Sequence, residues 1–99
     1  MCRVLVRSDH NRDVICVPER VAENLVSFRE RFDAWLRDPE NAHGYWRDVN
    51  EDFGSFRALE YDGAEAFTRW LTENVLEPGE QAYIATDVEP SASMPELYF

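Results

Sequence analysis

The sequence contains no lysine, and its last thirty residues contain no cationic side chain of any kind. Residues 70–99 carry six carboxylates, and residues 38–69 carry eight carboxylates against three arginines. Residues 1–37 are close to neutral, so the formal net charge of −10 belongs to the later part of the chain. Phosphate groups repel such a charge, which argues against direct binding of nucleic acid.

Long apolar runs are also missing. No stretch approaches the roughly 18 apolar residues of a membrane-spanning helix. The N-terminus has only a three-residue apolar stretch before Arg7, which does not fit a secretory signal. We therefore expect a cytoplasmic protein that does not engage a membrane. Because the cytosol keeps thiols reduced, we expect Cys2 and Cys16 to be free, with Cys16 as a buried packing residue.

Signatures of catalysis and of metal binding are absent as well. The chain has four glycines and two histidines, with no G-x-S-x-G motif and no glycine-rich phosphate loop. Its cysteines and histidines do not have the spacing of a zinc site. The segment Asp48–Gly54 begins like a calcium-binding loop, but Phe53 stands where that loop needs glycine and Leu59 where it needs a bidentate glutamate. We expect no enzymatic activity, no metal and no cofactor.

The N-terminal segment has the pattern of a β-hairpin. Residues 2–7 and 13–17 are β-branched and apolar runs, separated by turn-forming residues. A register that sets Ser8 opposite Asp13 gives the hairpin one buried face, because opposed residues share a face. That face is formed by Val4, Val6, Ile15 and Val17.

Two segments have the apolar spacing of amphipathic helices. The first begins at Pro18, a residue suited to the first helical position, and runs to about Arg37. The second begins after Asp62, an N-cap residue that Glu65 complements in a capping-box pattern. It ends before the turn sequence at residues 77–80.

The remaining segments are less regular. Alternation predicts further strands at residues 56–61 and 81–88. Residues 38–54 have no clear pattern: residues 38–44 are predicted to be a loop, and Tyr45–Val49 either a short helix or an irregular aromatic segment that packs on the core.

The order ββαβαβ predicts an α+β fold: a mostly antiparallel sheet of about four strands with two helices on one face. Residues 1–89 are expected to form this single domain, and residues 90–99 a C-terminal tail. The last residues of the tail, 97–99, are apolar enough to dock onto the body or onto a partner.

The clustered acidity favours a function as an acidic inhibitor or decoy. Carboxylates accept the same bidentate arginine contacts as phosphates, so they can fill the basic nucleic-acid-binding groove of a partner. Phage anti-CRISPR proteins and nuclease-immunity proteins act in this way as functional classes, although no motif ties the chain to either. The expected partner is a basic protein, such as a nucleic-acid-binding protein or a nuclease complex. The expected contact residues, converging on one side of the molecule, are Tyr45, Trp46, Asp48, Glu51, Asp52, Glu60, Asp62, Glu65, Glu73, Glu77, Glu80, Asp87 and Glu89.

A small cytosolic adaptor or accessory subunit is the alternative. It would bind its partner through exposed aromatic surface, with Tyr45-Trp46 and the apolar C-terminal residues as candidates. The acidity would then serve only solubility. Salt separates the two hypotheses, because the affinity of a decoy falls steeply with added salt and that of an adaptor does not.

Overall fold

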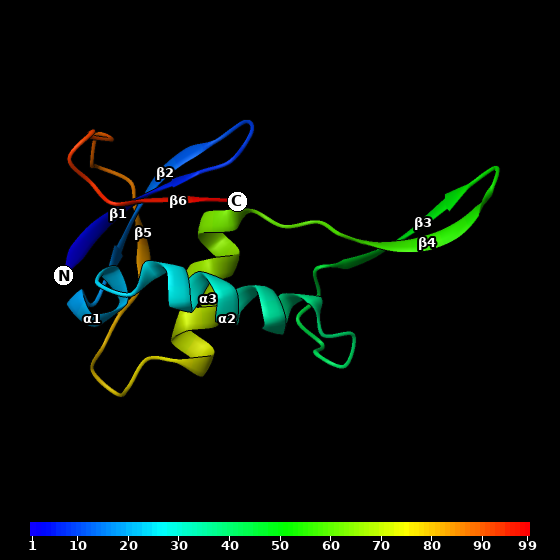
Figure 1. Ribbon diagram of the computed structural model, residues 1–99, viewed down its shortest axis with the longest axis horizontal. Helices are drawn as coiled ribbons and strands as arrows, with labels where there is room; N and C mark the ends of the chain where they lie inside the picture. Colours follow the sequence, from blue (N-terminus) through cyan, green and yellow to red (C-terminus); the bar gives the residue numbers. More distant parts are fainter.

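Four strands form the main sheet of the computed structural model, which describes all of residues 1–99 (Figure 1). β1 (Cys2–Arg7) and β2 (Arg12–Val17) form a central antiparallel hairpin. β5 (Tyr83–Ala85) pairs antiparallel with β2, and β6 (Glu96–Tyr98) pairs parallel with β1, which gives the order β5-β2-β1-β6. The chain is therefore a small single α+β domain with a mostly antiparallel sheet, as predicted at that level.

The predicted hairpin forms with a register shifted by two residues. Arg7, rather than Ser8, begins the ladder, and Val4 lies opposite Ile15. Ser8 is part of the turn, where its backbone N–H donates to the carbonyl of Asn11 at 2.9 Å and its Oγ accepts from Asn11 at 3.2 Å. A shift of two residues leaves every side chain on its original face. The predicted buried face is therefore correct although the predicted partners are not.

The first predicted helix is divided into α1 (Glu19–Ala22) and α2 (Leu25–Arg37). The helix breaks at Asn24, whose backbone leaves the helical region at φ −132° and ψ 38°. The side-chain amide of Asn24 donates to the carbonyl of Arg20 at 2.9 Å and thereby caps the end of α1. Asparagine offers the backbone such an alternative to helical hydrogen bonds, which explains the break inside a continuous apolar pattern.

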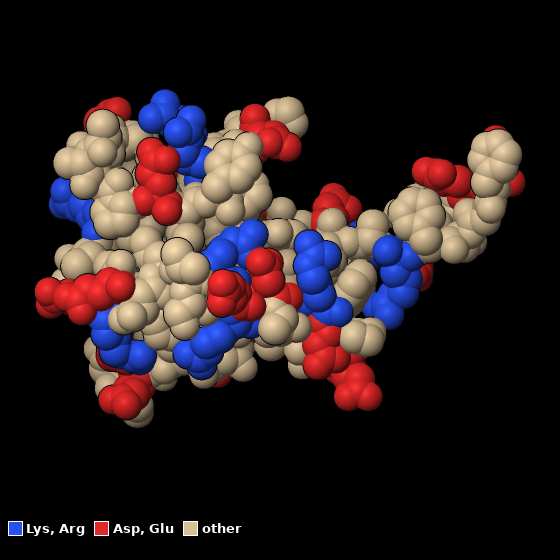
Figure 2. Space-filling model, viewed as in Figure 1, with Lys and Arg blue, Asp and Glu red and all other residues tan.

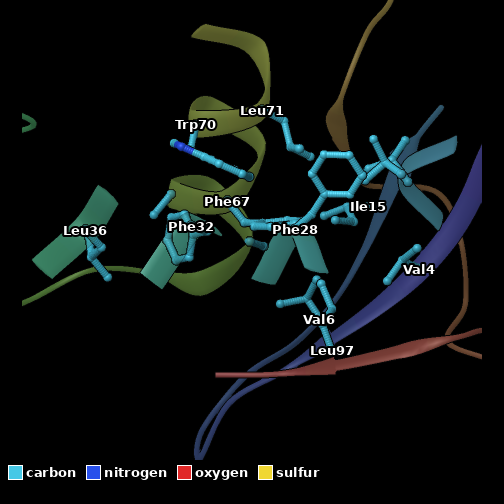
Figure 3. Packing of buried hydrophobic residues seen from close by; sticks show 14 residues of the cluster. Val4, Val6, Ile15, Phe28, Phe32, Leu36, Phe67, Trp70, Leu71 and Leu97 are labelled. Carbon is cyan, nitrogen blue, oxygen red and sulfur yellow. The ribbon is translucent and has the colours of Figure 1, made fainter. Parts of the chain in front are cut away.

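α3 (Gly63–Asn74) begins as predicted, because Oδ1 of Asp62 accepts a hydrogen bond from the backbone N–H of Ala64 at 3.3 Å. α2 and α3 pack on the same face of the sheet, where Phe32 lies at the centre of the core (Figure 3). Phe32 is fully buried and meets the rings of Phe67, Trp70 and Phe99 at centroid separations of 5.5–5.8 Å. Three helices therefore form where two were predicted, and side chains from all three share one core cluster with the buried face of the hairpin.

The other face of the hairpin is also covered. Leu5, Val14 and Cys16 point away from the helices and are nevertheless buried. The chain after β5 lies beside this face, where residues 86–88 line one hollow together with Arg3 and Cys16. The strand predicted at 81–88 is shorter than expected, because only residues 83–85 pair with β2.

The expected C-terminal tail contributes to the fold. Residues 96–98 form the parallel edge strand β6, whose Leu97 is buried in the core. The backbone N–H of Phe99 donates to the carbonyl of Arg7 at 2.8 Å, and its ring packs over Gly63. The apolar character of residues 97–99 is therefore used inside the chain, and the domain extends beyond the predicted boundary at residue 89.

Residues 46–59, which we call the arm, form a separate two-stranded sheet. β3 (Trp46–Glu51) and β4 (Gly54–Leu59) pair antiparallel, with Trp46 opposite Leu59 and Glu51 opposite Gly54. The arm projects from the rest of the molecule, which we call the body, and lengthens it to 46 Å against 29 and 21 Å in the other directions (Figure 1). The predicted loop at 38–44 is confirmed, but residues 46–49 are a strand rather than a helix or an irregular segment, and the strand predicted at 56–61 belongs to the arm and not to the main sheet. No helix has the length and apolar character needed to cross a bilayer.

Candidate interaction surface

A buried histidine holds the base of the arm, residues 43–46 and 59–60, which we call the root. His43 is 5% exposed, and its Nε2 lies 2.8 Å from the carbonyl oxygen of Leu36. Its Nδ1 accepts a hydrogen bond from the backbone N–H of Tyr45 at 3.0 Å. Since Nδ1 must accept, Nε2 carries the proton, and the arrangement requires the neutral Nε2–H tautomer. The end of α2 is thereby connected to the start of the arm through one imidazole.

Tyr45 connects the root to α3. Its hydroxyl donates to Oε2 of Glu65 at 2.8 Å, and the guanidinium of Arg69 lies over its ring at 5.3 Å. Burial, followed by the hydrogen bond to Glu65, raises the pKa of the Tyr45 hydroxyl. Arg69 also donates to the carbonyl of His43 at 2.6 Å and pairs with Glu73 at 3.1 Å. Glu65 thus orients the arm root and does not complete the predicted capping box.

Trp46 begins the arm and is half-buried between its neighbours. Its ring stacks on His43 at 6.3 Å and lies beneath the guanidinium of Arg57 at 4.9 Å. Its indole Nε1 is buried and has no hydrogen-bond partner. Across the root, the backbone N–H of Glu60 donates to the carbonyl of Tyr45 at 2.9 Å and closes the base of the hairpin. Both predicted aromatic contact residues therefore hold the arm in position.

The part of the arm beyond its root, residues 48–56, which we call the distal arm, has one polar and one partly apolar face. Asn50 and Ser55 are paired across the polar face, with the Ser55 hydroxyl donating to Oδ1 of Asn50 at 2.6 Å. On the other face Val49 lies opposite Phe56, which is 51% exposed. Phe53 forms the turn together with Asp52 and is fully exposed. The distal arm thus displays large apolar side chains that the fold does not bury.

Five of the eleven predicted acidic contact residues are engaged within the chain. Three form ion pairs: Glu60 with Arg47 at 3.8 Å, Glu73 with Arg69, and Glu80 with Arg20 at 2.7 Å. The other two accept hydrogen bonds, from Tyr45 to Glu65 and from the start of α3 to Asp62. These carboxylates support the fold and are only partly free to serve a partner.

The six predicted acidic residues whose side chains form neither an ion pair nor a hydrogen bond lie in three separate places. Glu77 lies in the turn after α3, and Asp87 and Glu89 lie at the opposite end of the body (Figure 1). On the body, acidic and basic side chains are intermixed over the face in Figure 2. The expected convergence on one side is therefore not how these residues are arranged. The remaining three, Asp48, Glu51 and Asp52, are exposed together on the distal arm.

Of these three places, the distal arm carries the most acidic residues without an ion pair. Residues 48–56 carry three carboxylates and no arginine, and all three side chains are solvent-exposed. The nearest arginines along the arm are Arg47, which pairs with Glu60, and Arg57, which lies opposite Asp48 in the ladder without an ion pair and has its guanidinium over the Trp46 ring. Phe53 and Phe56, which sequence reasoning left unassigned, lie in the same segment. The alternation on both sides of Asp52–Gly54 was the available signal for a hairpin with this turn.

Other parts of the surface show no comparable site. No three His, Cys, Asp or Glu side chains are grouped so that they could hold a metal ion. The largest hollow, about 580 Å³ beside the α1–α2 junction, is open and is lined by Glu23, Asn24 and Val26 among others. No protein-family model, curated protein or solved structure matches the chain.

Proposed function

We propose that this protein is a non-enzymatic acidic inhibitor or decoy of the cytosol, which inserts its arm into the basic groove of a nucleic-acid-binding partner. The observation that supports this function is the exposure of Asp48, Glu51 and Asp52, without ion pairs, on a segment that projects from the body. The free thiols of both cysteines agree with a reducing compartment.

The shape of the arm suits a groove. A six-residue strand is about 20 Å long, so the arm is a narrow two-stranded ribbon that projects far enough to enter a groove. Arginine forks that bind phosphate accept a carboxylate with the same bidentate geometry. Because the three arm carboxylates have no internal ion pair, no existing ion pair must be broken when a partner binds them.

The body would serve the same function at longer range. Its net negative charge steers a basic partner toward the protein and raises the association rate, although its carboxylates are dispersed. The arm would thus make the contact, and the net charge of the body would supply the long-range attraction. Salt weakens both, and weakens the long-range part most.

A charge-matched pair of variants tests this proposal. The arm variant Asp48→Asn, Glu51→Gln, Asp52→Asn and the body variant Glu77→Gln, Asp87→Asn, Glu89→Gln each remove three negative charges. Wild-type protein and both variants are immobilised and exposed to an extract of the native host. Bound proteins are then eluted with duplex DNA, with RNA and with salt. We expect basic proteins that nucleic acid displaces, retained by the wild-type and body variants and lost by the arm variant.

Two results would contradict the proposal. Equal loss of binding in both variants would show that only total charge matters. Capture of proteins that nucleic acid does not displace, or of none that it displaces, would show that the arm does not occupy a nucleic-acid groove.

The adaptor remains the second candidate function, because Phe53 and Phe56 are exposed. An adaptor would bind with little dependence on salt and would tolerate the neutral arm variant. Trp46→Ala would weaken it, because that change removes the support of the arm root.

A further inference from the structure

The residue at the end of the arm is not required by the turn that holds it. Glu51 and Gly54 are paired, so Asp52 and Phe53 form a two-residue connection. The unusual backbone conformation falls on Gly54, with φ +135°, and no other residue of the arm has a positive φ. Position 53 therefore accepts most residues, and polar ones are usual in turns. A phenylalanine that is fully exposed there contributes nothing to folding.

The surroundings of this phenylalanine extend the apolar surface. The Val49–Phe56 pair lies on one face of the arm, close to the turn in the ladder, and Phe56 is half exposed. Aromatic side chains contribute much of the affinity of protein interfaces when they enter a pocket. The end of the arm thus combines an aromatic anchor with a small apolar flank.

The charges around Phe53 determine which kind of surface can bind it. Asp52 adjoins Phe53 in sequence and Glu51 is one residue further away, at the end of β3, whereas Asp48 lies earlier on the same strand, opposite Arg57. An anionic lipid surface would repel this end of the arm, and so would nucleic acid. A second copy of the same chain, with a net charge of −10, would also be repelled. The complementary surface is an apolar pocket on another protein, bordered by arginine or lysine side chains.

We infer that Phe53 is an anchor residue that enters an apolar pocket with a cationic rim in the partner's groove. This inference rests on the proposed function for the identity of the partner as a basic protein. It adds that the carboxylates and the aromatic ring act together at one contact. The arm alone supplies 14 residues, fewer than the roughly 20–30 per side of a stable interface, so a strong anchor is needed.

Photo-crosslinking tests where the ring binds. Benzoylphenylalanine replaces Phe53 in one protein and Val26 in a control, because Val26 is also strongly exposed at 73% but lies on the body. Both proteins are irradiated in extract of the native host, and crosslinked peptides are mapped by mass spectrometry. We expect one main adduct from position 53, on apolar residues flanked by arginine or lysine, and no such adduct from position 26.

Affinity measurements with the crosslinked partner complete the test. Phe53→Ala is expected to weaken binding by about 30-fold or more at both low and high salt, and Phe53→Leu by much less. Equal affinity of wild-type protein and Phe53→Ala, or adducts without nearby cations, would overturn the inference. The proposed function fails separately if the partner needs Phe53 but is not displaced by nucleic acid. It survives alone if nucleic acid displaces a partner that ignores Phe53.

Discussion

Phe32 and Phe67 in the body are fully buried, whereas Phe53 at the end of the arm is fully exposed and Phe56 is half exposed. The same residue type thus stabilises one region and is displayed by the other. Burying a phenylalanine contributes about 1.5–3 kcal/mol, so displaying two of them gives up stability that the body alone must supply. The arm thus displays the residue type that the body uses for its core, which is the arrangement that the proposed contact function requires.

The arm nevertheless has a defined conformation, and its order comes from the root. An isolated two-stranded hairpin is at best marginally stable in water. Here the hairpin is fixed by His43, by the Tyr45–Glu60 backbone contact and by the Trp46–Arg57 stack. A rigid root with an exposed end presents a contact surface at low entropic cost to binding.

The largest difference in unfolding free energy is expected between Phe67→Ala in the body and Phe53→Ala in the arm. Phe67→Ala removes a fully buried ring and should cost about 3–5 kcal/mol of unfolding free energy. Phe53→Ala removes a fully exposed ring and should change it by no more than about 0.5 kcal/mol. Urea unfolding followed by tryptophan fluorescence measures both. Comparable losses in the two variants would mean that the end of the arm packs on the body.

A substitution at the root should affect the arm more than the body. His43→Ala leaves the carbonyl of Leu36 and the N–H of Tyr45 without their partner. The cost is expected to be about 2–4 kcal/mol, since each orphaned buried group costs about 1–3 kcal/mol. Amide hydrogen exchange should accelerate most in residues 46–59. His43→Asn, whose Oδ1 can accept from Tyr45, should restore part of the protection, and uniform acceleration throughout the chain would contradict this role.

Glycine-to-alanine changes should distinguish packing in the body from backbone conformation in the arm. A Cβ at Gly63 would lie 2.8–3.0 Å from three atoms of the Phe99 side chain, so Gly63→Ala should cost about 1–3 kcal/mol of global stability through overpacking. A Cβ at Gly54 meets open space, but its φ of +135° strains any other residue by about 1–3 kcal/mol. That strain should appear as faster exchange in the arm with an unchanged body. A global loss from Gly54→Ala would contradict the separation.

Sequence patterns predicted the elements whose apolar residues face one core. The hairpin face and α3 with its Asp62 cap were correct, because periodicity and capping are local properties. The arm was missed because alternation identifies a strand but not the sheet that it joins. His43 was missed as well: it stands in a polar loop segment, and its burial depends on carbonyl and N–H groups supplied by Leu36 and Tyr45.

The dispersal of the carboxylates could not be predicted for a related reason. Charge runs along the sequence show where acidity accumulates, but the fold determines which acids meet a cation. Glu80 illustrates this, since its partner Arg20 lies 60 residues away in sequence. Residues 48–56 contain no arginine and project from the body, so their three carboxylates stay exposed together, whereas the unpaired acids of the body are dispersed.

The smallest expected effect on stability comes from the ion pair between Arg20 and Glu80, which joins α1 to the turn after α3. Arg20 on α1 donates two hydrogen bonds to Glu80 and holds the pKa of that carboxyl at about 2, below its usual value of 4.5. A pKa lower in the folded state means that the pair stabilises the fold above about pH 4.5 and that this contribution is lost as pH falls toward about 2. Because both groups are solvent-exposed, the effect should be small and should diminish in high salt. Urea midpoints of wild-type protein, Glu80→Gln, Arg20→Gln and the double variant, measured at neutral pH and through this acid range, check it. Glu80→Gln and the double variant should share one flattened acid dependence, and Arg20→Gln should lie between them and the wild type, because the backbone N–H of Glu77 still donates to Glu80. A Glu80→Gln profile as steep as that of the wild type would assign the acid sensitivity to other carboxylates.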